Sequence, residues 1–355
     1  MSESRKADHL ALCATAAVGF RDTTTLLEEV GLVHEALPEL SLDQVDLSTS
    51  LLRHPLGAPL VLSAMTGGVD EAEPLNRALA RVAQEFGLAL GFGSMRPLLE
   101  RGDRRGYLVR DQAPDAMLLG NLGVVQARKI GLGQLQDALG ETGCDALCVH
   151  LNPAMEVVQP EGDRDFRGGI EAIARMVSGL DVPVIVKETG SGLSRATAER
   201  LVRVGVRAVD VSGAGGTSWV GVEALRADAT RALGERFWDW GIPTAASLAQ
   251  LTDLELEVIA TGGVSHGIDV ARALALGATA GGMARAVLQA WTAGGEAAVR
   301  ALVVQTLREI RVAMLLTGAG SVAAMRRTTV VIGPNLMRWV PPGVSLRQRL
   351  AAGPR

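Results

Sequence analysis

The sequence predicts a (β/α)8 barrel, the TIM-barrel fold, and three observations favour it. Short apolar runs alternate with amphipathic stretches from residue 58 onward, and there are eight such runs. Each run has glycine or a small polar residue at or near its end. The body of each run is largely apolar, as expected of parallel strands that helices cover on both faces. Eight strand–helix units over roughly 250 residues match the size of this barrel. A doubly wound open sheet is the alternative.

The expected strands and helices follow one another along the chain. The strand segments are "APLVLSAMTGG", "LALGFGSM", "AMLLGNLG", "ALCVHLNP", "PVIVKETG", "AVDVSGAGG", "EVIATGGV" and "ATAGGMARA". Between the first two, "EPLNRALARVAQEFG" places Leu75, Leu79 and Val82 on one helical face. The segment "SRATAERLVRVG" begins with Ser194 as an expected N-cap and ends at Gly205. The long segment between the sixth and seventh runs is expected to cross the barrel mouth and then to form the seventh helix.

The barrel is expected to be one domain with additions at both ends. Residues 1–57 form an N-terminal extension, residues 58–318 the barrel, and residues 319–355 a C-terminal tail. The tail is expected to pack either on the domain or on a neighbouring molecule.

Composition excludes several classes of protein. Hydrophobic residues make up 48% and charged residues 21%, and the formal net charge is −4. This balance argues against nucleic acid or an anionic membrane surface as the main partner. The charge-free stretches are broken by glycine and too short to span a bilayer, and the N-terminus lacks the apolar core of a signal peptide. Three cysteines do not suggest a disulfide framework. A cytoplasmic protein is expected.

Polar residues stand at nearly every strand end, which is where a barrel carries its reactive groups. Packing in the core does not account for these polar residues, because the rest of each strand is apolar. In order, the strand ends carry Ser63, Ala64, Met65 and Thr66, then Ser94, Met95 and Arg96, Asn121, His150 and Asn152, Lys187 and Glu188, Ser212, Gly262 and Gly263, and Gly281 and Gly282.

Glycine-rich loops follow the last three strands. "TGGVSHG" (261–267) and "GGMARA" (281–286) come after strands seven and eight, the usual position of a barrel phosphate site. There, glycines let backbone N–H groups approach an anion, and a helix N-terminus adds partial positive charge. "SGAGGTS" (212–218) offers further amides. Ordinary tight turns are the alternative reading, but together the loops favour a phosphate-bearing cofactor such as FMN.

Lys187 ends a run, "VPVIVK", that is otherwise free of polar residues, and it is one of only three lysines. Such a lysine can form a Schiff base as in aldolases, stabilise a reduced flavin, or pair with a carboxylate. The nearby phosphate loops and the polar residues Asn121 and Thr66 favour the flavin. An imine that borohydride traps would instead indicate an aldolase.

The loop after the fourth strand is rich in carboxylates, with Glu156 followed by three more between residues 161 and 165. It is either a solvated acidic loop or a site for a hard cation such as Mg²⁺, which binds carboxylates together with phosphate oxygens. Arg5, Lys6 and Arg96 are natural counter-charges for a polyanionic substrate.

These motifs resemble, in order and spacing, those of the type 2 isopentenyl-diphosphate isomerases. The matching segments run from about residue 5 to 340 and include "RKADHL", "SAMTGG", "GFGSMR", "GNLG", "VHLNPAMEVVQPEGDRDF", "VKETGSGLS", "DVSGAGGTSW", "DWGIPT" and "TGGVSHGIDVARALALGA". The resemblance implies an FMN-dependent barrel, usually a homo-oligomer. Such enzymes interconvert isopentenyl and dimethylallyl diphosphate with reduced FMN, NADPH as reductant, and Mg²⁺. Because the reaction has no net redox change, the flavin is expected to act through N5 as an acid–base group.

The resemblance also implies roles for individual residues. Flavin contacts are expected at Ala64, Met65, Thr66, Ser94, Asn121, Lys187 and Thr217, with Ser63 and Ser212 added from their positions at strand ends. Gly262, Gly263, Ala284 and Arg285 are expected to hold the FMN phosphate. Diphosphate and substrate contacts are expected at Arg5, Lys6, His9, Ser94, Arg96, His150, Asn152 and Met155. Glu156 is the expected Mg²⁺ ligand, and His150, Met155 and Lys187 are the expected catalytic residues.

One departure from the family pattern bears on function. Directly before the metal-binding glutamate the family usually has glutamine, a proposed proton relay, whereas this chain has Met155. Met95 likewise stands where glutamine is common. A thioether cannot donate a proton and is a weak acceptor. The sequence therefore leaves open an FMN-dependent oxidoreductase, an isomerase of another prenyl-like substrate, or a catalytically silent relative.

Overall fold

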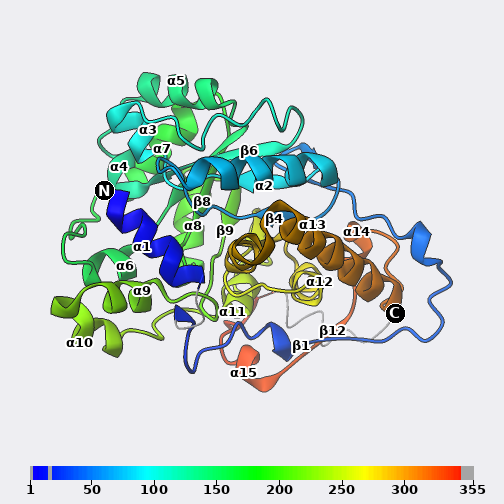
Figure 1. Cartoon of the computed structure of the whole chain (residues 1–355). Helices are drawn as coiled ribbons and strands as arrows, with labels where there is room; N and C mark the ends of the chain where they lie inside the picture. Colours follow the sequence, from blue (N-terminus) through cyan, green and yellow to red (C-terminus); the bar gives the residue numbers. More distant parts are fainter. Residues whose placement is uncertain (1–2, 15–17, 345–355) are drawn as a thin grey trace.

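The computed structural model describes residues 3–14 and 18–344, with side chains from residue 8 onward, and its centre is a closed barrel of eight parallel strands (Figure 1). The strand order around the barrel is β10-β11-β4-β5-β6-β7-β8-β9, so the strands follow the chain and close on themselves. The strands are β4 (Leu60–Leu62), β5 (Ala89–Gly91), β6 (Met117–Gly123), β7 (Ala146–His150), β8 (Val184–Lys187), β9 (Ala208–Asp210), β10 (Glu257–Ala260) and β11 (Ala280–Met283). The predicted TIM barrel is confirmed, and each strand lies within its expected apolar run.

Helices surround the barrel, and most form where amphipathic patterns predict them. Helix α2 buries Leu75, Leu79 and Val82, and the side chain of Ser194 caps α8 by accepting from the N–H of Thr197. The helices are α2 (Ala72–Phe86), α3 (Arg96–Arg101), α4 (Val124–Ala127), α5 (Leu132–Thr142), α6 (Pro153–Val158), α7 (Gly169–Gly179), α8 (Arg195–Arg203), α9 (Trp219–Arg226), α10 (Asp228–Arg236), α11 (Thr244–Ala249), α12 (Gly267–Leu276) and α13 (Arg285–Leu316), the last broken at Gly294 and Gly295.

The bottom of the barrel is closed by a hairpin. Strands β2 (Thr49–Leu51) and β3 (His54–Leu56) pair antiparallel just before the barrel begins. Leu51 and Leu56 are buried with the side chains that fill the barrel interior, Val61, Leu119 and Ile185 among them. The interior is thus a packed apolar core below the strand ends, and only its upper layer is polar.

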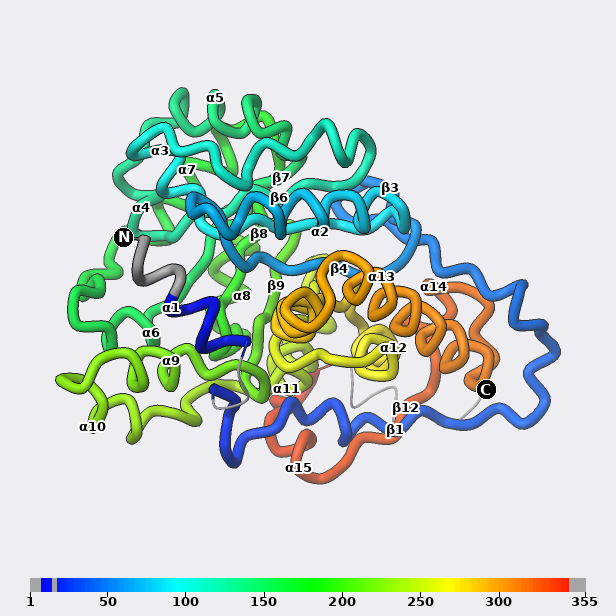
Figure 2. Tube along the Cα trace, viewed as in Figure 1, coloured from blue at the N-terminus to red at the C-terminus, as the bar shows by residue number. Residues whose placement is uncertain are grey.

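A strand of the N-terminal extension pairs with a strand of the C-terminal tail on the outside of the barrel. Strand β1 (Val30–Leu32) pairs antiparallel with β12 (Val330–Ile332), and Figure 2 shows these two segments side by side. The short helices α14 (Val322–Met325) and α15 (Pro334–Met337) flank β12, and the 3-10 turns Leu27–Glu29 and Leu42–Gln44 lie in the N-terminal extension. The described part of the tail therefore packs on its own domain.

Helix α1 (Glu3–Ala14) lies beside the barrel mouth and contacts α9 and α13 (Figures 1 and 2). The long gap after β9 contains α9, α10 and α11, and α9 also contacts α6. This arrangement brings the N-terminal extension to the carboxyl ends of the strands. Among the described residues, no helix is both long and apolar enough to cross a membrane.

Candidate active site at the carboxyl ends of the strands

Three neighbouring strands, β7, β8 and β9, end in polar residues that point into the barrel. Strand pairing places Gly123 opposite His150, His150 opposite Lys187, and Lys187 opposite Asp210. Side chains alternate between the two faces of a strand. The residues two positions earlier, such as Cys148, Ile185 and Ala208, belong to the barrel interior. The polar groups therefore form the top layer of that interior.

The hydrogen bonds of Asn121 determine the tautomer of His150. Nδ2 of Asn121 donates to the carbonyl oxygen of Phe92 over 3.0 Å, which leaves its Oδ1 as an acceptor. His150 Nδ1 lies 2.9 Å from that oxygen and must carry the proton. Burial, together with the positive charge of Lys187, lowers the pKa of His150 to about 3. The imidazole is therefore neutral near pH 7, with Nε2 left as an acceptor.

Lys187 lies between His150 and a buried carboxyl group that the sequence analysis did not select. Its Nζ donates to the backbone oxygen of Glu188 over 2.5 Å. Asp210, on the next strand, accepts from the hydroxyl of Thr261 over 2.6 Å. Burial raises the pKa of Asp210, although the charge of Lys187 opposes this. An acidic residue within the apolar run "AVDVS" was the signal that could have identified it.

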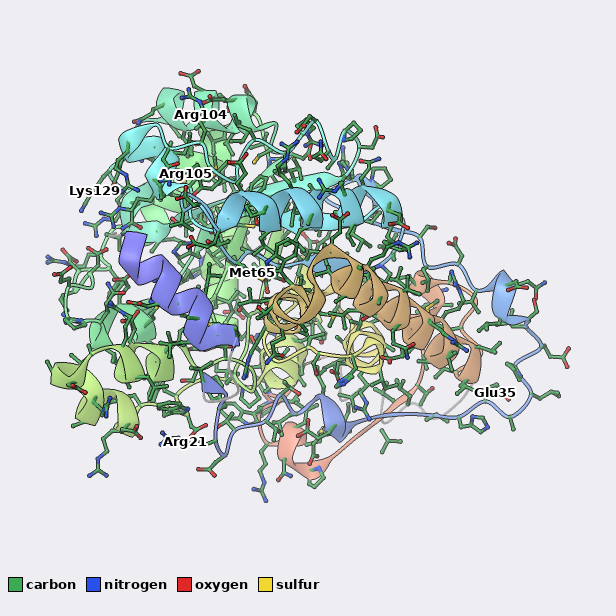
Figure 3. The ribbon with its side chains drawn as sticks, viewed as in Figure 1. Arg21, Glu35, Met65, Arg104, Arg105 and Lys129 are labelled. Carbon is green, nitrogen blue, oxygen red and sulfur yellow. The ribbon has the colours of Figure 1, made fainter. Side chains whose placement is uncertain are left out.

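A cavity of about 580 Å³ opens above this polar layer. All predicted site residues with described side chains line it: His9, Ser63, Ala64, Met65, Thr66, Ser94, Arg96, Asn121, His150, Asn152, Met155, Glu156, Lys187, Ser212, Thr217, Gly262, Gly263, Ala284 and Arg285. The side chains of Arg5 and Lys6 lie outside the described residues. In Figure 3, Met65 lies near the centre of the molecule, whereas Lys129 and Arg104 extend from its periphery. The structure thus gathers these residues at one place, while their individual roles stay predictions.

Glycines allow the loops after β9 and β10 to pack backbone on backbone. A Cβ on Gly216 would lie 2.3 Å from the backbone nitrogen of Gly263, and one on Gly262 would lie 2.1 Å from the oxygen of Gly213. Gly262 and Gly263 also have positive φ values, of 96° and 75°. Helix α13 begins beside them, and its residues Arg285 and Ala286 line the cavity. Backbone amides and a helix N-terminus suit a phosphate group.

Two buried hydroxyls support the fit of a flavin. The Oγ atom of Ser63 and the Oγ1 atom of Thr66 are buried and have no hydrogen-bond partner among the described residues. Both residues line the cavity, at the end of β4. Buried polar groups are nearly always paired in folded proteins, so these hydroxyls indicate that a polar ligand occupies this wall. The residues present therefore fit FMN.

On the far side of the barrel mouth, α6 carries Glu156. The sequence analysis treated this segment as a loop, and the structure corrects that: residues Pro153–Val158 are helical. Asn152 donates to Oε1 of Glu156, and the backbone N–H of Asp163 donates to Oε2, both over 2.9 Å. Among the described residues that line the cavity, Glu156 alone is a carboxylate. The described residues hold no cluster of three or more metal-binding side chains. Mg²⁺ is compatible with this, since it often has one protein carboxylate and takes its other ligands from phosphate and water.

Helix α1 is held over the cavity by a buried polar contact. His9 Nε2 lies 2.8 Å from Oε1 of Glu223 on α9, and its ring meets Trp219 edge to face. Burial disfavours the charged form of Glu223, but the hydrogen bond from His9 and the charge of Arg226 outweigh this and lower its pKa. The sequence analysis missed Trp219 and Glu223, because only the fold brings α9 against α1.

The two methionines that replace family glutamines have different surroundings. Met95 is fully buried, and a Cβ on Gly120 would lie 2.9 Å from its sulfur. Met155, on α6, lines the cavity. Only the second departure from the family pattern therefore faces the site.

Comparisons with known proteins identify the family. Isopentenyl-diphosphate delta-isomerase of Halobacterium salinarum is 46% identical over 348 residues, which cover 96% of each chain. The chain belongs to this family. The family members of Synechococcus sp. (46% identical, covering 92% of this chain and 95% of that protein) and Methanosarcina mazei (43% identical, covering 92% and 91%) agree. Residues 152–332 also match the family described as FMN-dependent dehydrogenase.

Solved structures agree with the isomerase family's barrel fold. A mandelate oxidase variant with a monooxide FMN adduct aligns with a TM-score of 0.60, at 20% identity and 92% coverage of both chains. A lactate oxidase of Pediococcus acidilactici aligns with a TM-score of 0.67, at 15% identity and 93% coverage of both. At such identity the likeness concerns the fold alone.

Proposed function

We propose that the protein interconverts isopentenyl diphosphate and dimethylallyl diphosphate with bound, reduced FMN, using NADPH as reductant and Mg²⁺ as the metal ion. The proposal rests on one observation, a single cavity whose opposite walls differ in chemistry. Strands β10 and β11, with their glycine loops, lie four positions around the barrel from β6 and β7. The first wall suits a flavin phosphate and the second a diphosphate headgroup.

The cofactor would be held by residues at the ends of every barrel strand except β7. The ring would contact Ser63, Ala64, Met65, Thr66, Ser94, Asn121, Lys187, Ser212 and Thr217, and the phosphate Gly262, Gly263, Ala284 and Arg285. When bound and reduced, FMN supplies an acid–base group at N5 beside the alkene. The Lys187 ammonium would stabilise negative charge on the ring.

The substrate headgroup would lie toward α1, α3 and α6. Arg96 would supply positive charge, with Arg5 and Lys6 as further expected contacts. Glu156, held by its hydrogen bond from Asn152, would be the metal ligand. His150, neutral and with its Nε2 free of a proton, can accept a hydrogen bond from the bound ligand. Met155 offers the alkene an apolar contact.

We further propose a homo-oligomer in the cytoplasm. The exposed side chains of Phe237 (43%), Trp240 (61%) and Trp339 (40%) form part of an apolar surface that a second copy would cover. The three cysteines are buried and free, as expected in a reducing compartment.

One anaerobic experiment separates the proposal from an FMN-dependent oxidoreductase, the alternative that Met155 raises. The purified protein is incubated with isopentenyl diphosphate, FMN, NADPH and Mg²⁺, and both products and NADPH are measured. The isomerase yields dimethylallyl diphosphate and consumes NADPH only to reduce the flavin once. An oxidoreductase consumes one NADPH per turnover. Absence of product with flavin bound and reduced would count against the isomerase.

A further inference from the structure

Gln159 is a cavity residue with no assigned role, and its environment is unusual. Only 2% of its surface is exposed, and the residue is part of the cavity wall. Its amide oxygen, Oε1, is buried without a hydrogen-bond partner among the described residues. An oxygen of this kind accepts only, so the missing partner is a donor or a cation.

The position of Gln159 relates it to Glu156. The backbone N–H of Gln159 bonds to the oxygen of Met155 over 3.0 Å, so the helical spacing of α6 continues to this residue. Residues three and four apart share one face of a helix. Gln159 therefore follows Met155 and Glu156 on the face of α6 that lines the cavity.

Arg164 holds this end of the helix in place. Its guanidinium donates to the backbone oxygens of Glu156, over 2.8 Å, and of Gln159, over 3.0 Å. The positive charge is thereby directed at the main chain, and the amide oxygen of Gln159 stays without a partner. A site built on a fixed backbone segment loses little entropy when it binds an ion.

We propose that Gln159 Oε1 is a second protein oxygen of the divalent-cation site, acting with the Glu156 carboxylate directly or through one metal-bound water. This inference rests on the proposed function, in which Mg²⁺ binds together with the substrate diphosphate. A carboxylate and an amide oxygen are both ligands that Mg²⁺ prefers, and phosphate oxygens and water supply the others. Gln159 supplies this amide oxygen one helical turn after Met155, whose own thioether is a poor ligand for a hard cation.

The test measures cation binding rather than turnover. Binding of Mn²⁺ to the FMN-loaded protein is followed by electron paramagnetic resonance in the presence of inorganic diphosphate. Loss of even an outer-shell partner of a metal site costs about 10–100-fold in affinity. Gln159→Met is therefore expected to weaken Mn²⁺ binding at least about tenfold, whereas Gln159→Glu, which keeps an oxygen and adds charge, should bind at least as tightly as wild type. Gln289→Met is the matched control, because Gln289 lines the same cavity on α13.

The outcomes separate this inference from the proposed function. If Glu156→Gln loses Mn²⁺ while Gln159→Met binds like wild type, Gln159 is not a ligand and the isomerase proposal stands. If Gln159→Glu is as weak as Gln159→Met, the amide N–H₂ rather than the oxygen is required, and the inference is overturned. If wild type binds no Mn²⁺ with diphosphate, both the inference and the metal ion of the proposed function are wrong.

Discussion

His150 and Asn121 are joined by a hydrogen bond of 2.9 Å between Nδ1 and Oδ1, and this bond fixes the tautomer of the imidazole at the barrel mouth. The pKa of His150 is lowered to about 3 from an ordinary value of 6.5. Between these two pH values the unfolded chain binds a proton that the folded protein does not. The contribution of His150 to the free energy of unfolding is therefore fully present above pH 6.5, and it declines as the pH falls toward 3.

We expect His150→Asn to remove this pH dependence from the ligand-free protein. From pH 7 to pH 5, wild type should lose about 2 kcal/mol of unfolding free energy more than the variant does. Urea unfolding at the two pH values measures the difference, and the other titrating groups cancel in the comparison. Equal pH dependence in both proteins would mean that His150 titrates in the folded protein near its ordinary pKa.

FMN binding should depend on the glycine loops. Adding a Cβ in Gly263→Ala forces contacts of 2.4 Å with Thr25 and 2.8 Å with the oxygen of Gly215, at a φ of 75°. We expect FMN affinity, measured by quenching of flavin fluorescence, to fall at least about tenfold, since strained backbone of this kind costs of order 1–3 kcal/mol. Gly140→Ala is the control, because nothing lies within 4 Å of a Cβ there. Equal FMN affinity in the two variants would place the phosphate elsewhere.

Lys187→Met should impair turnover more than substrate binding. Loss of a partly buried charged contact typically costs about 2–5 kcal/mol, so turnover with reduced FMN should fall at least tenfold. Lys129→Met is the control, because Lys129 is exposed at the periphery (Figure 3). Unchanged turnover in Lys187→Met would assign this lysine a structural role.

Met155→Gln should raise the isomerisation rate. Met155 lines the cavity, and an amide there can relay or orient a proton that a thioether cannot. Acid–base assistance is worth roughly 10²–10⁴-fold, so a partial gain should be measurable by product analysis at saturating substrate. Met95→Gln should give no gain, because Met95 is buried away from the cavity. An inactive wild type whose Met155→Gln variant gains activity would favour another natural substrate.

The sequence by itself determined the barrel and most of its active face. Apolar runs that end in polar residues specify both a parallel strand and which end of it is reactive, because parallel strands place all their carboxyl ends on one side. Lys187, Asn121 and the Gly262–Gly263 loop could be selected for this reason. The motif resemblance added His9 and chose Glu156 among the carboxylates of its segment as the metal ligand.

Only the tertiary structure decided which polar groups meet and which stay without a partner. Asp210 lies beside Lys187 through strand register, and Glu223 reaches His9 across 214 positions of the chain. The sequence does not distinguish the surroundings of Met95 from those of Met155. In the structure Met95 lies in the core, whereas Met155 lines the cavity. The amide oxygen of Gln159 is conspicuous only because the fold buries it without a partner. Burial and pairing are properties of packed surfaces, and these form from segments far apart in the chain.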